Sequence, residues 1–203
     1  MNNETIDFYN KAYSSKNGIQ LEWTAGTANP ELVKLVYEGK IAPESKILEV
    51  GCGMGAESAF LAARGMNVVA MDLSEAAIEN CKKLSDIYGV HVDWIAADFL
   101  TSDLFNEEFD IITDQGCFHH MHEEERALYA QKVLKYLKPG GMFILRAFSD
   151  KMPWGLQPRR ISSDDMLSTF YPDFKLEHME RILSFSTEKY TRPISWFTIW
   201  YKR

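Results

Sequence analysis

Three glycines follow a short apolar run in the sequence Leu48-Glu49-Val50-Gly51-Cys52-Gly53-Met54-Gly55. The run at residues 46–51 is typical of a buried strand, and residues 56–64, which Gly65 ends, predict a helix. Glycine accepts positive φ angles and lets the backbone approach a ligand closely. These residues therefore predict a strand, a tight ligand-binding turn and a helix, in that order.

Short apolar runs alternate with longer amphipathic runs in the residues that follow. Further strands are predicted at residues 67–72, 90–96, 109–114 and 142–148. Helices are predicted between the N-cap Ser74 and Gly89, and at residues 123–137 before Pro139-Gly140-Gly141. Strands that alternate with helices predict a parallel sheet with helices on both faces.

The two ends of the chain depart from this alternation. After a short predicted helix at residues 162–170, residues 174–183 and 195–202 predict two strands with no helix between them, and hence an antiparallel pair at the sheet edge. Residues 1–45 predict a helical cap at one end of the sheet, with one helix from Pro30 to Gly39. We expect an α/β fold: a doubly wound, mostly parallel, seven-stranded Rossmann-like sheet in a single domain of residues 1–203, with residues 46–203 as its core.

The chain of 203 residues has the size of one domain, and its formal net charge is −7. An acidic protein lacks the basic surface that nucleic-acid binders use, so we expect no nucleic-acid partner. The first residues form no basic and apolar leader, and no apolar run is long enough to span a bilayer. The cysteines Cys52, Cys81 and Cys117 are scattered, which suits a reducing compartment. We therefore expect a cytoplasmic protein without a membrane partner, and the oligomeric state is left open.

Asp72 ends the second predicted strand, where its carboxylate can accept both hydroxyls of an adenosine ribose. The turn also satisfies the relaxed dinucleotide pattern through Gly51, Gly53 and Ala56, so an NAD(P)-dependent oxidoreductase is the alternative. Glu49 argues against that alternative, because a carboxylate suits a cationic ligand and repels a pyrophosphate. The chain also ends in the predicted strand pair, without a second mononucleotide-binding half.

The glycine turn belongs to a longer series of motifs, which continues with Asp72, Ala97-Asp98-Phe99, Phe109-Asp110 and Leu137-Lys138-Pro139-Gly140-Gly141. Over residues 45–148 this series resembles that of the class I S-adenosylmethionine-dependent methyltransferases. The resemblance implies S-adenosyl-L-methionine as cofactor, with the turn at the methionine moiety, Asp72 at the ribose and Asp98 beside the adenine. The predicted cofactor-binding residues are Glu49, Gly51, Cys52, Gly53, Gly55, Asp72, Leu73, Asp98, Phe99 and Asp114.

Residues 114–119, Asp-Gln-Gly-Cys-Phe-His, resemble the D-R-G-x-F-H segment of the thiopurine and thiol S-methyltransferase-like branch. An early segment around Trp23 also resembles that branch, which implies a small-molecule acceptor and favours sulfur over oxygen or nitrogen. Gln115 stands where the branch has arginine, so a cation that could hold an anionic acceptor is missing there. The predicted substrate-binding residues are Trp23, Gln115, Phe118, Trp154 and Arg159.

Methyl transfer is an in-line displacement that needs orientation and exclusion of water more than a covalent nucleophile. If a base assists, the predicted catalytic residues are Asp114, His119 and His120, although a residue in such a loop more often only forms hydrogen bonds. His119, His122 and Cys117 have spacings that a metal site could use, but the resemblance explains this segment without metal, and we expect none. A non-catalytic, cofactor-binding regulatory subunit is left open.

Overall fold

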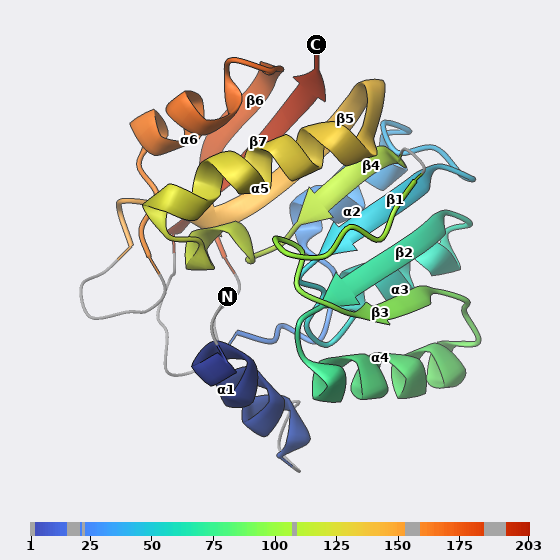
Figure 1. The fold of residues 1–203 in the computed structure, drawn as a ribbon. Coiled ribbons are helices and arrows are strands. Elements are labelled where there is room, and N and C mark those ends of the chain that lie inside the picture. The colour runs from blue at the N-terminus through green and yellow to red at the C-terminus, as the bar shows by residue number, and fades with distance from the viewer. Residues whose placement is uncertain (1–2, 16–20, 22, 107–108, 153–158, 185–193) are drawn as a thin grey trace. The chain divides into compact units, whose positions relative to one another are not determined.

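The computed structural model describes residues 3–15, 21, 23–106, 109–152, 159–184 and 194–203. These residues divide into two compact units, residues 1–103 and residues 104–203. The strands are hydrogen-bonded in the order β3-β2-β1-β4-β5-β7-β6, which confirms the predicted seven-stranded sheet (Figure 1). Within the described residues, no helix has the length and apolar character needed to cross a membrane.

In the first unit, β1 (Lys46–Val50) pairs with β2 (Asn67–Asp72), and β2 pairs with β3 (Asp93–Ala96), in parallel throughout. The helix α3 (Ala56–Ala63) joins β1 to β2, and α4 (Glu75–Tyr88) joins β2 to β3. The predicted third strand, residues 90–96, was too long. Gly89 ends α4 in a left-handed conformation, and the next N–H still donates to the Ser85 carbonyl, so pairing begins only at residue 93.

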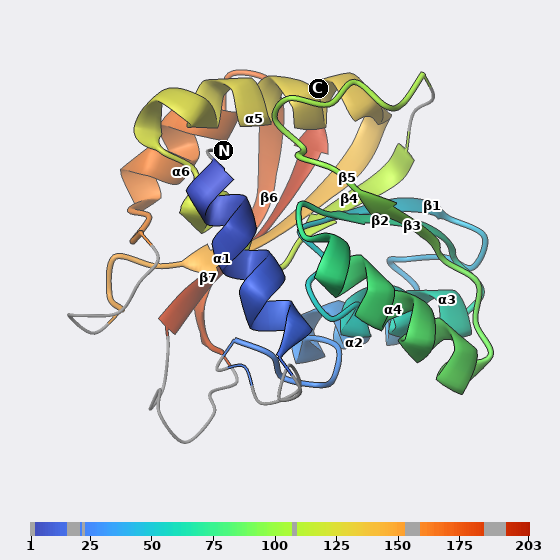
Figure 2. The ribbon, with the colours of Figure 1, turned by 60° about the horizontal axis from the view of Figure 1, so that its bottom comes forward.

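The helices of the N-terminal segment are α1 (Asn3–Ser14) and α2 (Pro30–Tyr37), while the described residues between them are not helical. The predicted helical cap of residues 1–45 was therefore correct only for these two segments. Figure 2 shows α1 alongside α4, and side-chain hydrogen bonds join them. The hydroxyl of the N-cap Ser74 donates to Asn10 Oδ1 at 2.8 Å, and Asn80 Nδ2 donates to the Tyr13 carbonyl at 3.0 Å.

In the second unit, β4 (Phe109–Asp114) pairs with β5 (Leu137–Phe148) in parallel, whereas β7 (Ile194–Lys202) pairs antiparallel with β5 and with β6 (Phe174–Leu183). The predicted antiparallel C-terminal pair is thus confirmed. β7 is buried along most of its length, as an inner strand should be, whereas the outermost strand β6 exposes most of its side chains. A short 3₁₀ helix, η2 (Phe118–His120), and α5 (Glu123–Tyr136) connect β4 to β5.

The strand β5 begins five residues before the predicted start at Met142, because the motif at residues 138–141 forms a bulge and not a loop. Phe109 pairs with Leu137 and Ile111 with Met142, so the extra residues bulge out between these pairs. A Cβ atom on Gly141 would lie 2.9 Å from the Lys138 carbonyl oxygen and 3.1 Å from that of Asp110. The glycine is therefore required by close backbone packing.

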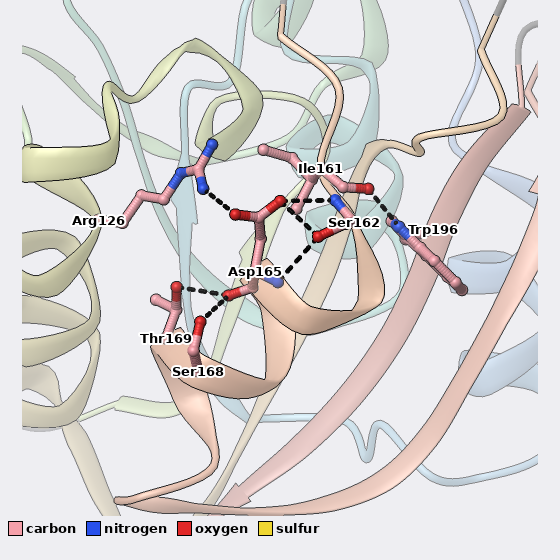
Figure 3. A network of polar contacts seen from close by, with 7 residues as sticks. All are labelled: Arg126, Ile161, Ser162, Asp165, Ser168, Thr169 and Trp196. Carbon is pink, nitrogen blue, oxygen red and sulfur yellow. Dashed lines mark hydrogen bonds and ion pairs between the residues drawn. The ribbon is translucent and has the colours of Figure 1, made fainter.

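The helix α6 (Ser163–Phe170) is tied to α5 through the carboxylate of Asp165, as Figure 3 shows. Arg126 Nη1 donates to Asp165 Oδ1 at 2.5 Å, and Ser162, the N-cap, donates its backbone N–H to Oδ2 at 2.8 Å. Trp196 Nε1 donates to the Ile161 carbonyl at 2.7 Å, which adds β7 to the network. These bonds fix the segment that enters α6, and this segment carries Arg159.

Candidate active site

The turn after β1 has the left-handed backbone that its glycines predict. Gly51, Gly53 and Gly55 have φ angles of 70°, 53° and 76°, a region that other residues enter at a cost. The N–H groups of Gly51 and Cys52 both donate to the Met71 carbonyl, at 2.8 and 3.0 Å. The end of β2 therefore holds the turn in place.

Two of these glycines also make room for neighbouring side chains. A Cβ atom on Gly55 would lie 2.7 Å from Trp94 Cη2 and 2.8 Å from Cys81 Sγ. A Cβ atom on Gly53 would lie 3.0 Å from the Tyr13 hydroxyl oxygen. The sequence motif indicated the positive φ angles, but this crowding comes from residues that are distant in the chain.

Asp72 connects the turn to the start of α4. Its Oδ2 accepts the N–H of Gly53 at 2.9 Å, and its Oδ1 accepts the N–H of Ser74 at 2.9 Å. Burial raises the pKa of Asp72, and the backbone donors of Ser74, Gly53 and Leu73 oppose this rise. A carboxylate oxygen has a second lone pair, so both oxygens can still accept a hydroxyl group.

The segment after β3 lies against the same point. The N–H of Ala97 donates to the Asp72 carbonyl at 2.9 Å, which brings the ends of β2 and β3 together. Asp98 Oδ1 accepts the N–H of Leu100 at 2.9 Å, while Phe99 is buried and Leu73 is half-buried. The structure therefore groups the turn, Asp72, Leu73, Asp98 and Phe99 at one end of the strands of the first unit.

Glu49 and Cys52 are the least exposed of the predicted cofactor residues that carry a polar side chain in this unit. Glu49 is 1% exposed and accepts a hydrogen bond from the Ser58 hydroxyl of α3. Burial, with a smaller contribution from Cys81, raises the pKa of the Cys52 thiol well above its usual value. Cys52 is thus a neutral packing residue of the turn.

An aromatic cluster of α1 and the following segment reaches the glycine turn. Trp23 Nε1 donates to the Tyr13 hydroxyl at 3.0 Å, and this hydroxyl is the group that approaches Gly53. Burial raises the pKa of Tyr13 well above its usual value, and the charge of Asp72 adds to the effect. Trp23 therefore lies beside the glycine turn with 46% of its surface exposed, whereas Trp154 lies outside the described residues.

In the second unit, Asp114 at the end of β4 is fully buried and accepts four hydrogen bonds. Three come from the backbone N–H groups of Gly116, Cys117 and Phe118, at 2.8, 2.6 and 2.8 Å, and one from the Tyr129 hydroxyl at 2.5 Å. Burial raises the pKa of Asp114, but these donors favour the ionised form. The carboxylate is thus directed at its own loop, which it organises.

A hydrogen bond to the His119 ring determines which of its two nitrogens carries the proton. Its Nδ1 accepts the backbone N–H of Phe148 at 3.0 Å, so the proton of the neutral ring resides on Nε2. Burial, followed by the charges of His120 and Arg146, lowers the pKa of His119 well below its usual value. The Phe148 ring stacks on the imidazole with centroids 4.4 Å apart. His119 therefore presents a hydrogen-bond donor.

His120 and Arg159 brace the same loop. Arg159 Nη1 donates to the His120 carbonyl at 2.9 Å, and Nη2 lies 2.8 Å from Nδ1 of the His122 ring. Burial, with a contribution from the Arg159 charge, lowers the pKa of His120 to about 4. The two residues predicted for catalysis and for substrate binding are therefore brought together by the structure.

Gln115 is 9% exposed, and its side chain is only partly satisfied. Its Nε2 donates to Thr113 Oγ1 at 2.9 Å, while its buried Oε1 has no hydrogen-bond partner among the described residues. Arg146 of β5 donates from Nη2 to the Gln115 carbonyl at 2.6 Å. Phe118, in contrast, is fully buried between Tyr129 and other core aromatics. The structure thus places Phe118 in the core.

Two residues at these sites, Tyr13 and Arg146, were not among the predicted site residues. Arg146 is the sole charge in the otherwise apolar residues 142–148, and this interruption was the available signal. Within the described part of the chain, no three histidine, cysteine or acidic side chains are grouped so that they could hold a metal ion.

Residues 47–141 match the protein family described as methyltransferase domain. The chain is 30% identical over 147 residues to the 2-heptyl-1-hydroxyquinolin-4(1H)-one methyltransferase of Mycobacteroides abscessus, and 31% identical over 152 residues to probable thiol methyltransferase 2 of Arabidopsis thaliana. The chain is therefore related to the S-adenosylmethionine-dependent methyltransferases. The matches to these relatives cover 70% and 74% of this chain but only 64% and 66% of the relatives themselves.

The fold of this chain is also found among solved structures. One, described as the conversion of a disulfide bond into a thioacetal group during echinomycin biosynthesis, matches 98% of this chain and 91% of its own, with a TM-score of 0.84 and 21% identity. That likeness concerns the fold alone. The relatives favour the methyl-donor cofactor, and nothing among them supports the nicotinamide alternative.

Proposed function

We propose that this chain is a methyltransferase that transfers the methyl group of S-adenosylmethionine to a small-molecule acceptor, with residues 1–203 acting as one domain. The observation that carries the proposal is the glycine turn pinned to Asp72 in the first unit. The turn offers a backbone that a ligand can approach, and Asp72 offers acceptors for ribose hydroxyls. These residues fit an adenosine cofactor.

Several residues of the first unit have a proposed role in binding that cofactor. Asp72 binds the ribose, while Leu73, Asp98 and Phe99 border the adenine. The glycine turn, with Glu49 beneath it, faces the methionine moiety, where a buried carboxylate favours a positively charged ligand. When bound, the cofactor supplies a methyl group on a cationic sulfur. The protein's task is to orient both reactants and exclude water.

For the acceptor we propose a small thiol. The name of the relative from Arabidopsis thaliana, a probable thiol methyltransferase, supports this class. A thiol requires little help from a base, because its thiolate is accessible near neutral pH. Trp23, Gln115 and Arg159 are the proposed acceptor-facing residues, together with Trp154, while Asp114 is proposed to organise the loop that carries Gln115.

The proposed setting is the cytoplasm, with a free small molecule as substrate and no nucleic-acid partner. The net charge of −7 supports the second point, since polyanions are repelled by an acidic surface. The free cysteines Cys52, Cys81 and Cys117 support the first, because reducing compartments keep thiols unpaired.

Calorimetry with S-adenosylhomocysteine, with NADH as the control ligand, tests the cofactor. We expect binding of the first and none of the second; no binding of S-adenosylhomocysteine at high micromolar concentration would contradict the proposal. Turnover is then measured with labelled methyl donor against a panel of thiols, phenols and amines. Cofactor binding without turnover of any acceptor would instead indicate a regulatory subunit.

A further inference from the structure

We infer that the loop after β4 contains an anion site for the acceptor, built around the bare Cα of Gly116 with His119 and Arg146 as its donors, so that the acceptor binds as a thiolate. The inference rests on the proposed function and deepens it. It assigns Arg146 to the acceptor and replaces the general base with two hydrogen-bond donors.

The first observation is the pair of side chains that lie beside Gly116. A Cβ atom on this residue would lie 3.4 Å from His119 Cε1, 3.7 Å from His119 Nε2 and 4.0 Å from Arg146 Nη2. Apart from the chain neighbours of Gly116, no described heavy atom comes closer to that point. The φ angle of 135° restricts the position to glycine, so no side chain of residue 116 comes between these groups and the backbone. An acceptor atom packed against the Gly116 Cα would therefore lie near two nitrogen-bearing groups.

The second observation is that both of those groups donate. His119 Nδ1 is occupied by the Phe148 N–H, which leaves the proton on Nε2, the nitrogen nearer to Gly116. The guanidinium of Arg146 is cationic at every relevant pH and carries donors only. A group held between them must accept hydrogen bonds, and it gains most if it is negatively charged.

The third observation concerns the missing arginine at position 115. In the related thiol methyltransferase-like branch the cation is expected on that residue, whereas here Arg146 of the neighbouring strand reaches the Gln115 carbonyl at 2.6 Å. The same loop thus receives a cation from β5. The buried Oε1 of Gln115, which has no partner among the described residues, can in addition accept a donor on the acceptor molecule.

These groups favour the ionised acceptor. A thiol loses its proton to solvent and keeps the electron pair on sulfur, and a nearby cation with an N–H donor stabilises that anion. The charged and titratable groups around Gly116 are His119 and His120 of η2, Arg146 of β5, Asp114 of β4 and Arg159. Asp114 opposes an anion, but four hydrogen-bond donors, including the N–H of Gly116, already stabilise its carboxylate.

The test is a pH titration of bound thiophenol, whose ionised form has its own ultraviolet absorption, in the presence of S-adenosylhomocysteine. We expect the bound thiol to ionise at a lower pH than the free thiol. In Arg146→Met the midpoint should return by about one pH unit towards that of free thiophenol. Arg64→Met, which removes an exposed arginine of the first unit, is the matched control and should leave the midpoint unchanged.

Kinetics with aliphatic and aromatic thiols of different acidity separate a donor from a base. If His119 donates, the acid limb of kcat/KM moves with the acidity of each thiol, and His119→Asn weakens all of them without removing the limb. A limb that stays fixed across the thiols and vanishes in His119→Asn would overturn the inference, as would an unchanged midpoint in Arg146→Met or no binding of thiophenol. If the unaltered chain does not bind S-adenosylhomocysteine, that result would instead contradict the proposed function.

Discussion

Asp72 and Asp114 have the same structural role at the ends of two strands. Each is a buried aspartate that ends a parallel strand and accepts N–H groups from the turn that follows. Donors of this kind are strong, because the acceptor is charged and the surroundings are poor in water. Asp72 adds a bond to Gly53, whereas Asp114 adds one to Tyr129. The first therefore holds two turns together, and the second holds a loop against α5.

Asp72→Asn should weaken the binding of S-adenosylhomocysteine by roughly tenfold to a hundredfold, because hydrogen bonds to a charged group contribute about 1.5–3 kcal/mol. The amide retains one acceptor oxygen and loses the charge. Calorimetry measures the affinity. Thermal unfolding without ligand serves as the control for loss of the turn, and an unaltered affinity would show that the ribose is bound elsewhere.

Tyr129→Phe should destabilise the second unit by about 1–3 kcal/mol, because the buried Asp114 loses a charge-assisted hydrogen bond. Tyr88→Phe is the matched control, since Tyr88 is 63% exposed on α4 and its change should stay within about 0.5 kcal/mol. Urea unfolding measures both. Equal effects of the two substitutions would mean that the bond to Asp114 contributes little to stability.

Among the elements, α3 is set in place by a glycine that serves as its N-cap. Gly55 has φ 76° and lies against Trp94 and Cys81, so both its conformation and its size are restricted. Gly39, after α2, has φ 72°, but a Cβ atom there would meet nothing within 4 Å. A comparison of Gly39 with Gly55 therefore separates the cost of a left-handed backbone from the cost of crowding around an added side chain.

Gly39→Ala should cost roughly 1–2 kcal/mol, the typical penalty of a left-handed non-glycine residue. Gly55→Ala should cost more, because the added methyl group would also displace Trp94 and Cys81, and it should weaken cofactor binding. Urea unfolding of both variants gives the difference. In the background of Cys81→Ala the extra cost should shrink, and a cost that persists undiminished would contradict the crowding argument.

How much could be predicted from the sequence depends on the range of the contacts. The strand Asn67–Asp72, the N-cap Ser74 and the glycine turn follow from neighbours along the chain, and they were predicted correctly. The approach of Tyr13 to Gly53 and of Arg146 to Gln115 arises from packing between segments that lie far apart in the sequence. Periodicity carries no information about such pairs, so these parts of the site appear only in the structure.

The bulge at the start of β5 shows the same limit for an element. Pro139-Gly140-Gly141 is a typical signal for the end of a helix, and α5 does end at Tyr136. The pairing of Leu137 with Phe109 nevertheless extends the strand backwards across the signal. Pairing between strands overrides the turn motif here, and such pairing cannot be recognised from the motif alone.

At the scale of the whole molecule, two buried histidines make stability depend on pH. His119 and His120 are neutral when folded, while in the unfolded chain a histidine takes up a proton below about pH 6.5. Protons therefore favour unfolding as the pH falls below that value. The raised pKa values of Asp72 and Asp114 act in the opposite sense, because the folded state then retains protons that the unfolded chain releases.

We expect the free energy of unfolding to fall between pH 6.5 and the pKa of His120 at about 4, and this histidine alone accounts for up to about 3 kcal/mol. Urea unfolding at about pH 7 and at about pH 5 measures how steeply the free energy of unfolding falls with pH. His120→Asn should flatten it. His91→Asn, which alters an exposed histidine, should not, and an equal slope in the His120 variant would refute the assignment.

The outermost strand β6 has a consequence for how copies of the chain meet. Its charged side chains Lys175, Glu177, Glu180 and Arg181 are exposed along a sheet that ends there. Another polypeptide adding a strand at this border would have to strip water from each of these charges. These charges therefore oppose the growth of fibrils at the edge of the sheet, both during synthesis on the ribosome and afterwards. Neutralising these side chains to ease crystallisation would make the protein more prone to aggregate.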